Sequence, residues 1–287
     1  MRRYLVALAL LAPSLALPLA APLAAADTPE SVACEGCKAV LDKVAANPLR
    51  DSDRARDAWR HPAETLEFFG VTPGMKVGEY APGGEWYSRF LGLYLGEKGR
   101  LVGLYFNPVS GPFKPETQDG IRKGAAGYPA DVAKFTGLPA DRFGGMTLET
   151  IPEAEKGTFD RIVVMRMLHN LMRWNIADSE IKAMRDLLKP GGMIGFEQHR
   201  ARADAPFSYA DGSNGYLRQA DVVKFMEVNG FDFVASSEIN ANPKDTANWP
   251  DGVWTLPPTL ALGDKDRATY AAIGETDRMT LLFRKRD

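Results

Sequence analysis

Two apolar segments of this chain, 159–167 and 192–198, end in side chains that could carry acid–base or binding chemistry. Five polar residues stand at or just past those ends: Arg166, His169, Asn170, Glu197 and His199. An imidazole exchanges protons near neutral pH, so His169 and His199 are candidate proton acceptors. We take them, with Arg166, as candidate catalytic residues, and Asn170 and Glu197 as candidate substrate contacts. Each histidine could equally be a packing residue, and the sequence leaves both interpretations open.

A second candidate site is the turn Pro82-Gly83-Gly84, which separates a strand pattern at 75–81 from a helical pattern at 86–95. Glycines let backbone amides approach a ligand closely, and the N-terminus of the following helix favours negative charge. Such a turn also occurs where only the path of the chain needs glycine. Its position after the first strand favours a binding role.

These segments resemble the class I S-adenosylmethionine-dependent methyltransferases, and more closely a group of exported predicted methyltransferases. The resemblance covers about residues 53–287. Several motifs carry it: Arg60-His61-Pro62 with Phe68-Phe69-Gly70, the turn region 79–87, the segment 159–170 and the segment 188–192. Two further segments, 240–245 and 253–258, are similar to the exported group in particular.

The resemblance implies S-adenosylmethionine as cofactor. It implies that Glu79 ends the first strand and holds the methionine amino group, while Ala81, Gly83 and Gly84 line the amino-acid moiety. The family pattern is acid-x-Gly-x-Gly-x-Gly. This chain departs from it, with Ala81 at the first glycine and Glu85 at the third. Beside the carboxylate of the cofactor, Glu85 would be repulsive.

The end of the second strand departs from the family as well. There the family usually has an acid that accepts hydrogen bonds from both ribose hydroxyls, and this chain has Tyr105. A phenol can stack or accept one hydrogen bond, but it lacks the paired acceptors of a carboxylate. The resemblance nevertheless assigns Tyr105 to the cofactor site.

Strand and helix patterns alternate along the chain from residue 53 onward. Strands are expected at 75–81, 100–106, 146–151, 159–167, 192–198, 231–239 and 279–285, and helices at 53–69, 86–95, 178–188 and 217–229. The region 111–142 reads as loop-rich. Such alternation predicts a doubly wound α/β domain with a mostly parallel sheet and helices on both faces. The resemblance makes it a Rossmann-like sheet of seven strands with the last one antiparallel.

Ligands of such sheets bind beyond the carboxyl ends of the strands. We therefore expect Arg166, His169, Glu197 and His199 to surround one cleft. The long segment 240–278 joins the last two strands on that side, and we expect it to cover the cleft with Trp254. It could serve as a lid over a ligand or as a plug that fills the pocket.

The N-terminal residues 1–26 have the three parts of a cleavable secretory signal: Arg2 and Arg3, an apolar stretch, and small residues before Asp27. The paired arginines leave both the general and the twin-arginine export routes open. We expect a periplasmic or secreted protein without stable membrane insertion once the signal is removed. The formal net charge is −2 before the two arginines are lost, which argues against nucleic acid as a partner.

Residues 27–52 form a short N-terminal segment before the domain at 53–287. Cys34 and Cys37 lie in it as a Cys-x-x-Cys, which favours a local disulfide or an incidental pair over a redox or zinc site. No metal is expected. Two functions remain open: a methyltransferase acting outside the cytoplasm on a small-molecule substrate, or a non-catalytic small-molecule-binding protein on the same scaffold.

Overall fold

A seven-stranded sheet with the order β3-β2-β1-β4-β5-β7-β6 divides this protein into two helical layers. The structure is a computed structural model and describes residues 34–287; the expected signal at 1–26 and the beginning of the segment 27–52 lie outside the described residues. The strands are β1 Lys76–Tyr80, β2 Arg100–Tyr105, β3 Phe143–Thr147, β4 Phe159–Met165, β5 Leu188–His199, β6 Phe231–Ser237 and β7 Arg278–Lys285. Strand β7 pairs antiparallel with both of its neighbours, and the other pairs are parallel. The predicted fold class is confirmed.

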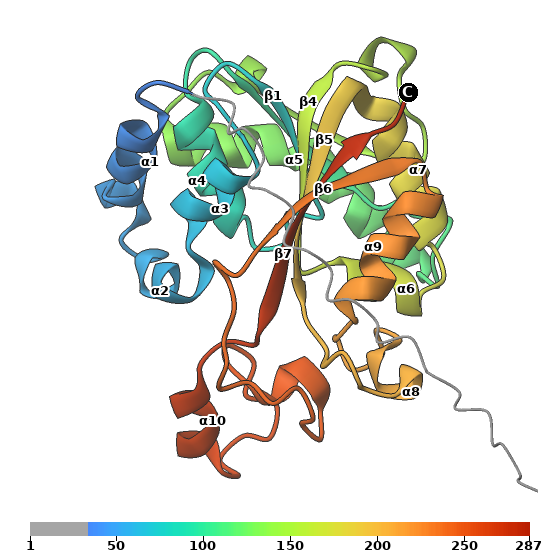
Figure 1. The fold of residues 1–287 in the computed structure, drawn as a ribbon. Helices are drawn as coiled ribbons and strands as arrows, with labels where there is room; N and C mark the ends of the chain where they lie inside the picture. The colour runs from blue at the N-terminus through green and yellow to red at the C-terminus, as the bar shows by residue number, and fades with distance from the viewer. Residues whose placement is uncertain (1–33) are drawn as a thin grey trace, which may run out of the picture.

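Helices cover both faces of the sheet (Figure 1). One layer contains α1 Cys37–Ala45, α3 Pro62–Phe68, α4 Trp86–Leu95 and α5 Pro115–Thr136; the other contains α6 Leu168–Arg173, α7 Ala177–Leu187 and α9 Gln219–Val228. Strand β4 contributes side chains to the hydrophobic core on each face of the sheet, because successive side chains of a strand point to opposite faces. Its Ile162 and Val164 pack with the second layer, and Val163 packs with the first.

The helix expected at 53–69 is broken. A 3₁₀ turn and the short helix α2 Asp57–Arg60 precede α3, and His61 between them has a left-handed backbone with φ of 38°. Pro62 disfavours the helical conformation in the residue before it, which explains the break. The helical periodicity continues across the break, so the pattern did not reveal it.

The expectation of a loop-rich region at 111–142 was wrong, because α5 spans 22 residues of it. Three glycines and the internal Pro129 lower the intrinsic helix propensity of this segment. Packing restores the helix: at Gly145 of β3, an added Cβ would lie 1.9 Å from the carbonyl oxygen of Ala125. The backbone of α5 thus rests directly on the sheet, and only glycine at position 145 permits this contact.

Other elements begin or end away from their expected bounds. Strand β3 starts at Phe143 rather than 146, since Gly144-Gly145 hid its first residues, and α6 was not expected. Helix α7 begins at Ala177, one residue before the expected start, and its N-cap residue Ile176 offers no side-chain hydrogen bond. Strand β5 begins at Leu188, four residues before the expected start.

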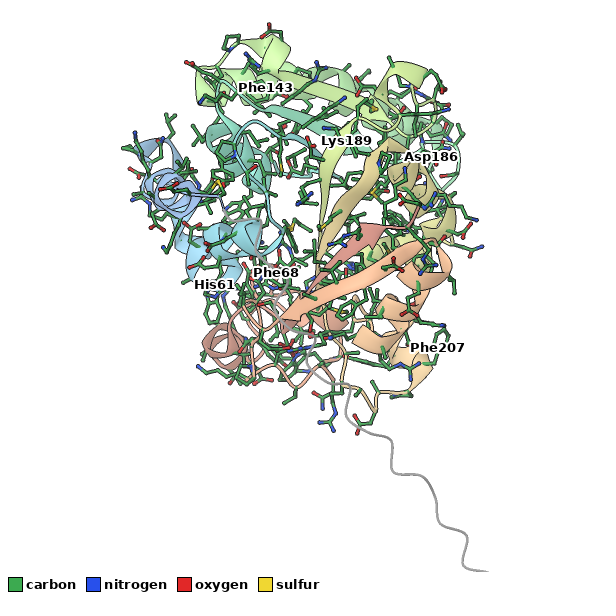
Figure 2. All side chains as sticks on the ribbon, turned by 45° about the horizontal axis from the view of Figure 1, so that its top comes forward. His61, Phe68, Phe143, Asp186, Lys189 and Phe207 are labelled. Atoms are coloured by element: carbon green, nitrogen blue, oxygen red, sulfur yellow. A yellow bond between two sulfur atoms is a disulfide. The ribbon has the colours of Figure 1, made fainter. Side chains whose placement is uncertain are left out.

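Two segments lie together beyond the carboxyl ends of the strands, and we call them the cap. Residues 200–218 include α8 Phe207–Ala210, and residues 240–277 include a 3₁₀ turn at Gly252–Thr255 and α10 Arg267–Ile273. Figure 1 shows both at the end of the sheet opposite the C-terminus. Figure 2 shows Phe207 of the cap at the other end of the molecule from Lys189. Tyr216 and Val253 pack in a core of their own within the cap.

At the N-terminal end of the described residues, a disulfide joins Cys34 to Cys37, the first residue of α1, in agreement with one of the two favoured interpretations of this pair. Within residues 34–287, none of the helices combines the length and the apolar character needed to cross a bilayer.

Candidate functional site

A cavity of about 440 Å³ lies at the carboxyl ends of β1 and β4. Four of the predicted cofactor residues line it: Glu79, Ala81, Gly83 and Gly84. The opposite wall comes from residues 52–60, with Arg56 and Arg60, and from Trp86, Tyr87 and Arg89 of α4. Sequence reasoning missed these three arginines as site residues. The signal for Arg56 and Arg60 was the basic run in 54–60, of which only Arg60 was used, as part of a motif of the resemblance.

The turn after β1 keeps the backbone of a glycine motif although two of its glycines are replaced. Ala81 and Glu85, which stand at the first and third glycine positions of the family pattern, have φ of 50° and 59°, and Gly83 has φ of 56°. Left-handed backbone in residues other than glycine is costly, by about 1 kcal/mol or more each, and often marks functional sites. All three residues therefore hold the left-handed backbone that glycine adopts most readily. At Gly84, a Cβ would meet no atom within 4 Å, so the turn leaves open space above it.

Glu79 forms the buried inner wall of this cavity. Its carboxylate accepts hydrogen bonds from Ser88 Oγ at 2.5 Å and from Tyr128 Oη at 3.0 Å. Burial raises the pKa of Glu79 to about 7, against the opposing effect of these hydrogen bonds. Glu79 is therefore poised between its neutral and charged forms at neutral pH, and a cationic ligand would favour the charged form.

Tyr105, the remaining predicted cofactor residue, is not among the residues that line this cavity. Its ring packs edge-on against Tyr128, with centroids 6.2 Å apart, and lies close to Gly124 of α5. The structure thus places Tyr105 against a helix that the sequence did not reveal.

A second cavity, of about 220 Å³, lies between the sheet and the cap. It brings together five of the residues predicted as catalytic or substrate contacts: Arg166, His169, Asn170, His199 and Trp254. The ring of His169 lies 5.4 Å from that of His199 and 6.0 Å from that of Trp254. Segment 240–277 of the cap lines this cavity with Val253, Trp254 and Pro257, and its action as a lid or as a plug stays a prediction.

The side chains of both histidines have uncharged hydrogen-bond partners. Nδ1 of His169 lies 3.3 Å from Nε2 of Gln198, and Nδ1 of His199 lies 2.5 Å from Oγ1 of Thr276. Burial lowers the pKa of His169 to about 4, and it lowers that of His199 well below its ordinary value. Both rings are therefore uncharged near neutral pH, because burial and nearby arginines oppose the imidazolium. Their assignment as proton acceptors stays a prediction, and their low basicity makes them less effective in that role.

Glu197, expected at the cleft, is fully buried behind it. Its carboxylate binds Arg166 at 2.8 Å and Arg278 at 3.0 Å, and Tyr87 Oη donates to it at 3.1 Å. Burial raises the pKa of Glu197, but the neighbouring arginines outweigh that effect and leave it lowered. Glu197 therefore positions Arg166 and does not itself reach the cavity.

A second buried carboxylate, Glu275 of the cap, binds arginines of residues 56–60, just before α3. It binds Arg278 at 2.7 Å and both Arg60 and Arg56 at 3.2 Å. Burial raises its pKa, but Arg278, Arg60 and their neighbours outweigh burial and lower it to about 2. Arg60 and Arg166 line both cavities, so this charged cluster forms the boundary between them.

Solved structures of low sequence identity share this architecture. A SAM-dependent methyltransferase from Aquifex aeolicus aligns with a TM-score of 0.51 and 14% identity, over 86% of this chain and 98% of its own. The cyclase SpnF aligns with a TM-score of 0.52 and 16% identity, over 88% of this chain and 96% of its own. Neither a family model nor a curated protein matches the sequence. At such identities the likeness establishes the fold: this chain has the fold of the class I S-adenosylmethionine-dependent methyltransferases.

Proposed function

We propose that this chain is an S-adenosylmethionine-dependent methyltransferase that acts on a small molecule. The cofactor would occupy the first cavity and the methyl acceptor the second. The observation that carries this proposal is the pair of cavities at the carboxyl ends of the strands, which meet at Arg60 and Arg166. A methyl group could pass from one ligand to the other only where two such cavities adjoin.

The residues of the first cavity fit the amino-acid part of the cofactor. Gly84 leaves room for the ligand beside the turn, and Glu79 offers a carboxylate to an ammonium group. The described residues that line this cavity include no acid from β2 for the ribose hydroxyls, because Tyr105 stands at that position and turns to α5. We therefore propose that recognition rests mainly on the amino-acid end.

When bound, S-adenosylmethionine supplies a methyl carbon to a lone pair of the acceptor, while the electrons of the broken carbon–sulfur bond stay on sulfur. The residues of this chain would mainly orient the acceptor. Gln198 donates one amide hydrogen to the Gly215 carbonyl at 2.9 Å and faces Nδ1 of His169 with the same nitrogen. If the amide of Gln198 donates its other hydrogen to Nδ1, the ring proton of His169 lies on Nε2. We therefore propose that Nε2 of His169 donates a hydrogen bond to the molecule that accepts the methyl group.

Calorimetry with S-adenosylmethionine and S-adenosylhomocysteine tests the proposal. We expect both to bind the purified chain and Gly84→Val to abolish binding, because the valine side chain fills the space above the turn. A Cβ at Gly84 meets no protein atom, so this variant should fold normally, and its circular dichroism should match that of the unmodified protein. Failure of both ligands to bind the unmodified protein would overturn the proposal.

A second function is favoured by two particular residues. The carboxylate of Glu85 beside the turn and the phenol of Tyr105 at the ribose position both depart from the family. They support the alternative of a non-catalytic protein that binds a small molecule on this scaffold. In that case the second cavity would bind its ligand although S-adenosylhomocysteine does not bind the first.

We further propose that the protein is exported, with cleavage of its signal before Asp27. Mass spectrometry of the protein from the cell envelope should find Asp27 as the first residue. Replacing Arg2 and Arg3 with lysine should stop export by the twin-arginine route and spare the general route. Protein with an intact N-terminus in the cytoplasm would contradict this proposal.

A further inference from the structure

The boundary between the two cavities carries more positive than negative charge. Four arginines converge there on two buried carboxylates, Glu197 and Glu275: they are Arg56, Arg60, Arg166 and Arg278. The pKa of each carboxylate is lowered by these arginines, so both are ionised and the cluster retains an excess of two positive charges.

In the part of the chain that the structure describes, no other acid forms an ion pair with these four arginines. Asp53 is bound to Arg89 by two hydrogen bonds of 2.6 and 2.5 Å. Asp277 is bound to Arg200 at 2.8 Å, and Arg200 also binds Glu238 at 2.7 Å. Arg173 adds further positive charge next to the second cavity, where it stacks on Trp254 at 5.5 Å. Charges buried without a partner are costly, so this excess calls for an anion.

The two arginines that face both cavities have hydrogen-bond donors to spare. Arg60 uses only Nε on Glu275, and Arg166 uses only Nη1 on Glu197. Within residues 34–287, no acceptor takes a hydrogen bond from the two Nη atoms of Arg60, or from Nε and Nη2 of Arg166. Burial and the nearby Arg166 also lower the pKa of Arg60 to about 10, against the effect of Glu275.

We propose that the second cavity binds an anionic small molecule, anchored by a carboxylate or a chemically similar anion between Arg60 and Arg166. Guanidinium groups suit such anions because their paired N–H groups match two oxygens at once. The rest of the ligand would lie toward His169, His199 and Trp254, whose neutral rings offer aromatic contact and hydrogen bonds. Its role as methyl acceptor rests on the proposed function.

A bound anion would also reduce the electrostatic repulsion between these arginines and a positively charged cofactor. A sulfonium cofactor is itself a cation, and beside Arg60 and Arg166 it would meet two like charges. An anionic group between the arginines compensates them when both ligands are bound. Because the anchoring oxygens are held by guanidinium groups, the methyl group would go to another atom of the acceptor.

Benzoate, with neutral benzamide as its isosteric control, tests the site in the purified chain. We expect calorimetry to show saturable binding of benzoate and binding of benzamide at least about 10-fold weaker. Arg60→Gln should weaken benzoate binding by about 10- to 100-fold, the effect of losing a hydrogen-bonded charge. In this variant Glu275 keeps Arg278 and Arg56 as partners. The control variant Arg122→Gln removes an exposed arginine of α5 and should leave binding unchanged.

A final titration separates this inference from the proposed function. Benzoate should bind equally well when the protein is saturated with S-adenosylhomocysteine. If that ligand prevents benzoate binding, the arginines serve the carboxylate of the cofactor and the inference is overturned. It is also overturned if benzoate fails to bind, or binds no better than benzamide, in the unmodified protein. If benzoate binds and S-adenosylhomocysteine does not, the anion site stands and the methyltransferase proposal fails.

Discussion

Glu79 of the first cavity is a buried carboxylate, and its burial lowers the stability of the folded protein at neutral and high pH. Burial raises its pKa from 4.5 to about 7. The unfolded chain therefore loses this proton at lower pH than the folded protein does. Glu79 leaves stability unaffected below about pH 4, reduces it progressively between pH 4.5 and 7, and imposes its full cost above that range. Such a cost is typical of a residue kept for its function rather than for stability.

Replacing Glu79 with glutamine should remove this cost. We expect Glu79→Gln to raise the free energy of unfolding by up to about 3 kcal/mol at pH 9 and to leave it nearly unchanged at pH 4. The amide oxygen can still accept from Ser88 and Tyr128. Urea denaturation at the two pH values measures the difference, and Glu97→Gln on the exposed surface is the control. A gain that is equal at both pH values would show that ionisation is not its cause.

Glu85 holds a left-handed backbone between Gly84 and Trp86, which both line the same cavity. Glycine adopts this conformation without strain, so Glu85→Gly should leave the protein as stable or more stable in thermal unfolding. It also removes a carboxylate near the proposed site of the carboxylate of the cofactor. We expect S-adenosylhomocysteine to bind about two- to fivefold more tightly by calorimetry. The matched variant Gly83→Ala, which places a Cβ at φ of 56°, should instead lower stability. Weaker ligand binding in Glu85→Gly would indicate that Glu85 contacts the cofactor.

At the scale of elements, the packing of α5 on the sheet requires glycines in the neighbouring strands, whereas the sequence of α5 itself has a low helix propensity. Gly103 lies under the ring of Tyr128, and Gly145 lies under the backbone of the helix. These contacts place Tyr128 where it donates to Glu79. The position of α5 therefore affects the cavity through one hydrogen bond.

Two glycine substitutions distinguish the packing of α5 from its helix propensity. Gly145→Ala should destabilise the protein by several kcal/mol, about 2–4, because its Cβ would overlap the Ala125 carbonyl. Gly120→Ala, within α5 where a Cβ meets no neighbour, should stabilise it by about 0.5–1 kcal/mol. Chemical denaturation of both variants measures these changes. Similar effects from the two substitutions would contradict the close contact between α5 and β3.

At the scale of the whole molecule, buried ion pairs join regions distant in the sequence: residues 56–60, the end of β5, the cap and the start of β7. Asn240 adds hydrogen bonds to Thr65 at 2.9 Å and to Thr280 at 3.0 Å. These contacts fix the cap over the carboxyl ends of the strands. We infer a cap that is part of the folded domain, so that small ligands enter beside it.

Loss of the Glu275 carboxylate should lower the free energy of unfolding, because it removes the ion pairs that join these regions. Its pKa is lowered from 4.5 to about 2, so its contribution to stability is complete above about pH 5 and is lost as the pH falls toward 2. We expect Glu275→Gln to lower the free energy of unfolding by about 3 kcal/mol at pH 7 and by much less at pH 3. Denaturation curves at both pH values test this, with Glu238→Gln, whose carboxylate is exposed, as the control. An undiminished loss at pH 3 would rule out the ion pairs as its origin.

The sequence alone predicted the α/β class, the bounds of α4 and the strand β1 within one or two residues. Each depends on local properties: the spacing of apolar residues and a turn rich in glycine. It also predicted that the ends of β4 and β5 meet at one cleft, because parallel strands end at the same edge of a sheet. These inferences needed no knowledge of distant contacts.

Only the tertiary structure decided the rest. It showed α5, whose glycines conceal a helix that packing against β3 stabilises. It also showed that burial keeps both histidines neutral, and that residues 200–218 share in the cap. The arginine at the centre of the proposed anion site, Arg60, binds Glu275, which lies 215 positions away in the chain. The protonation of a group and the pairing of a charge depend on burial and on neighbours brought together by folding, which local sequence patterns do not contain.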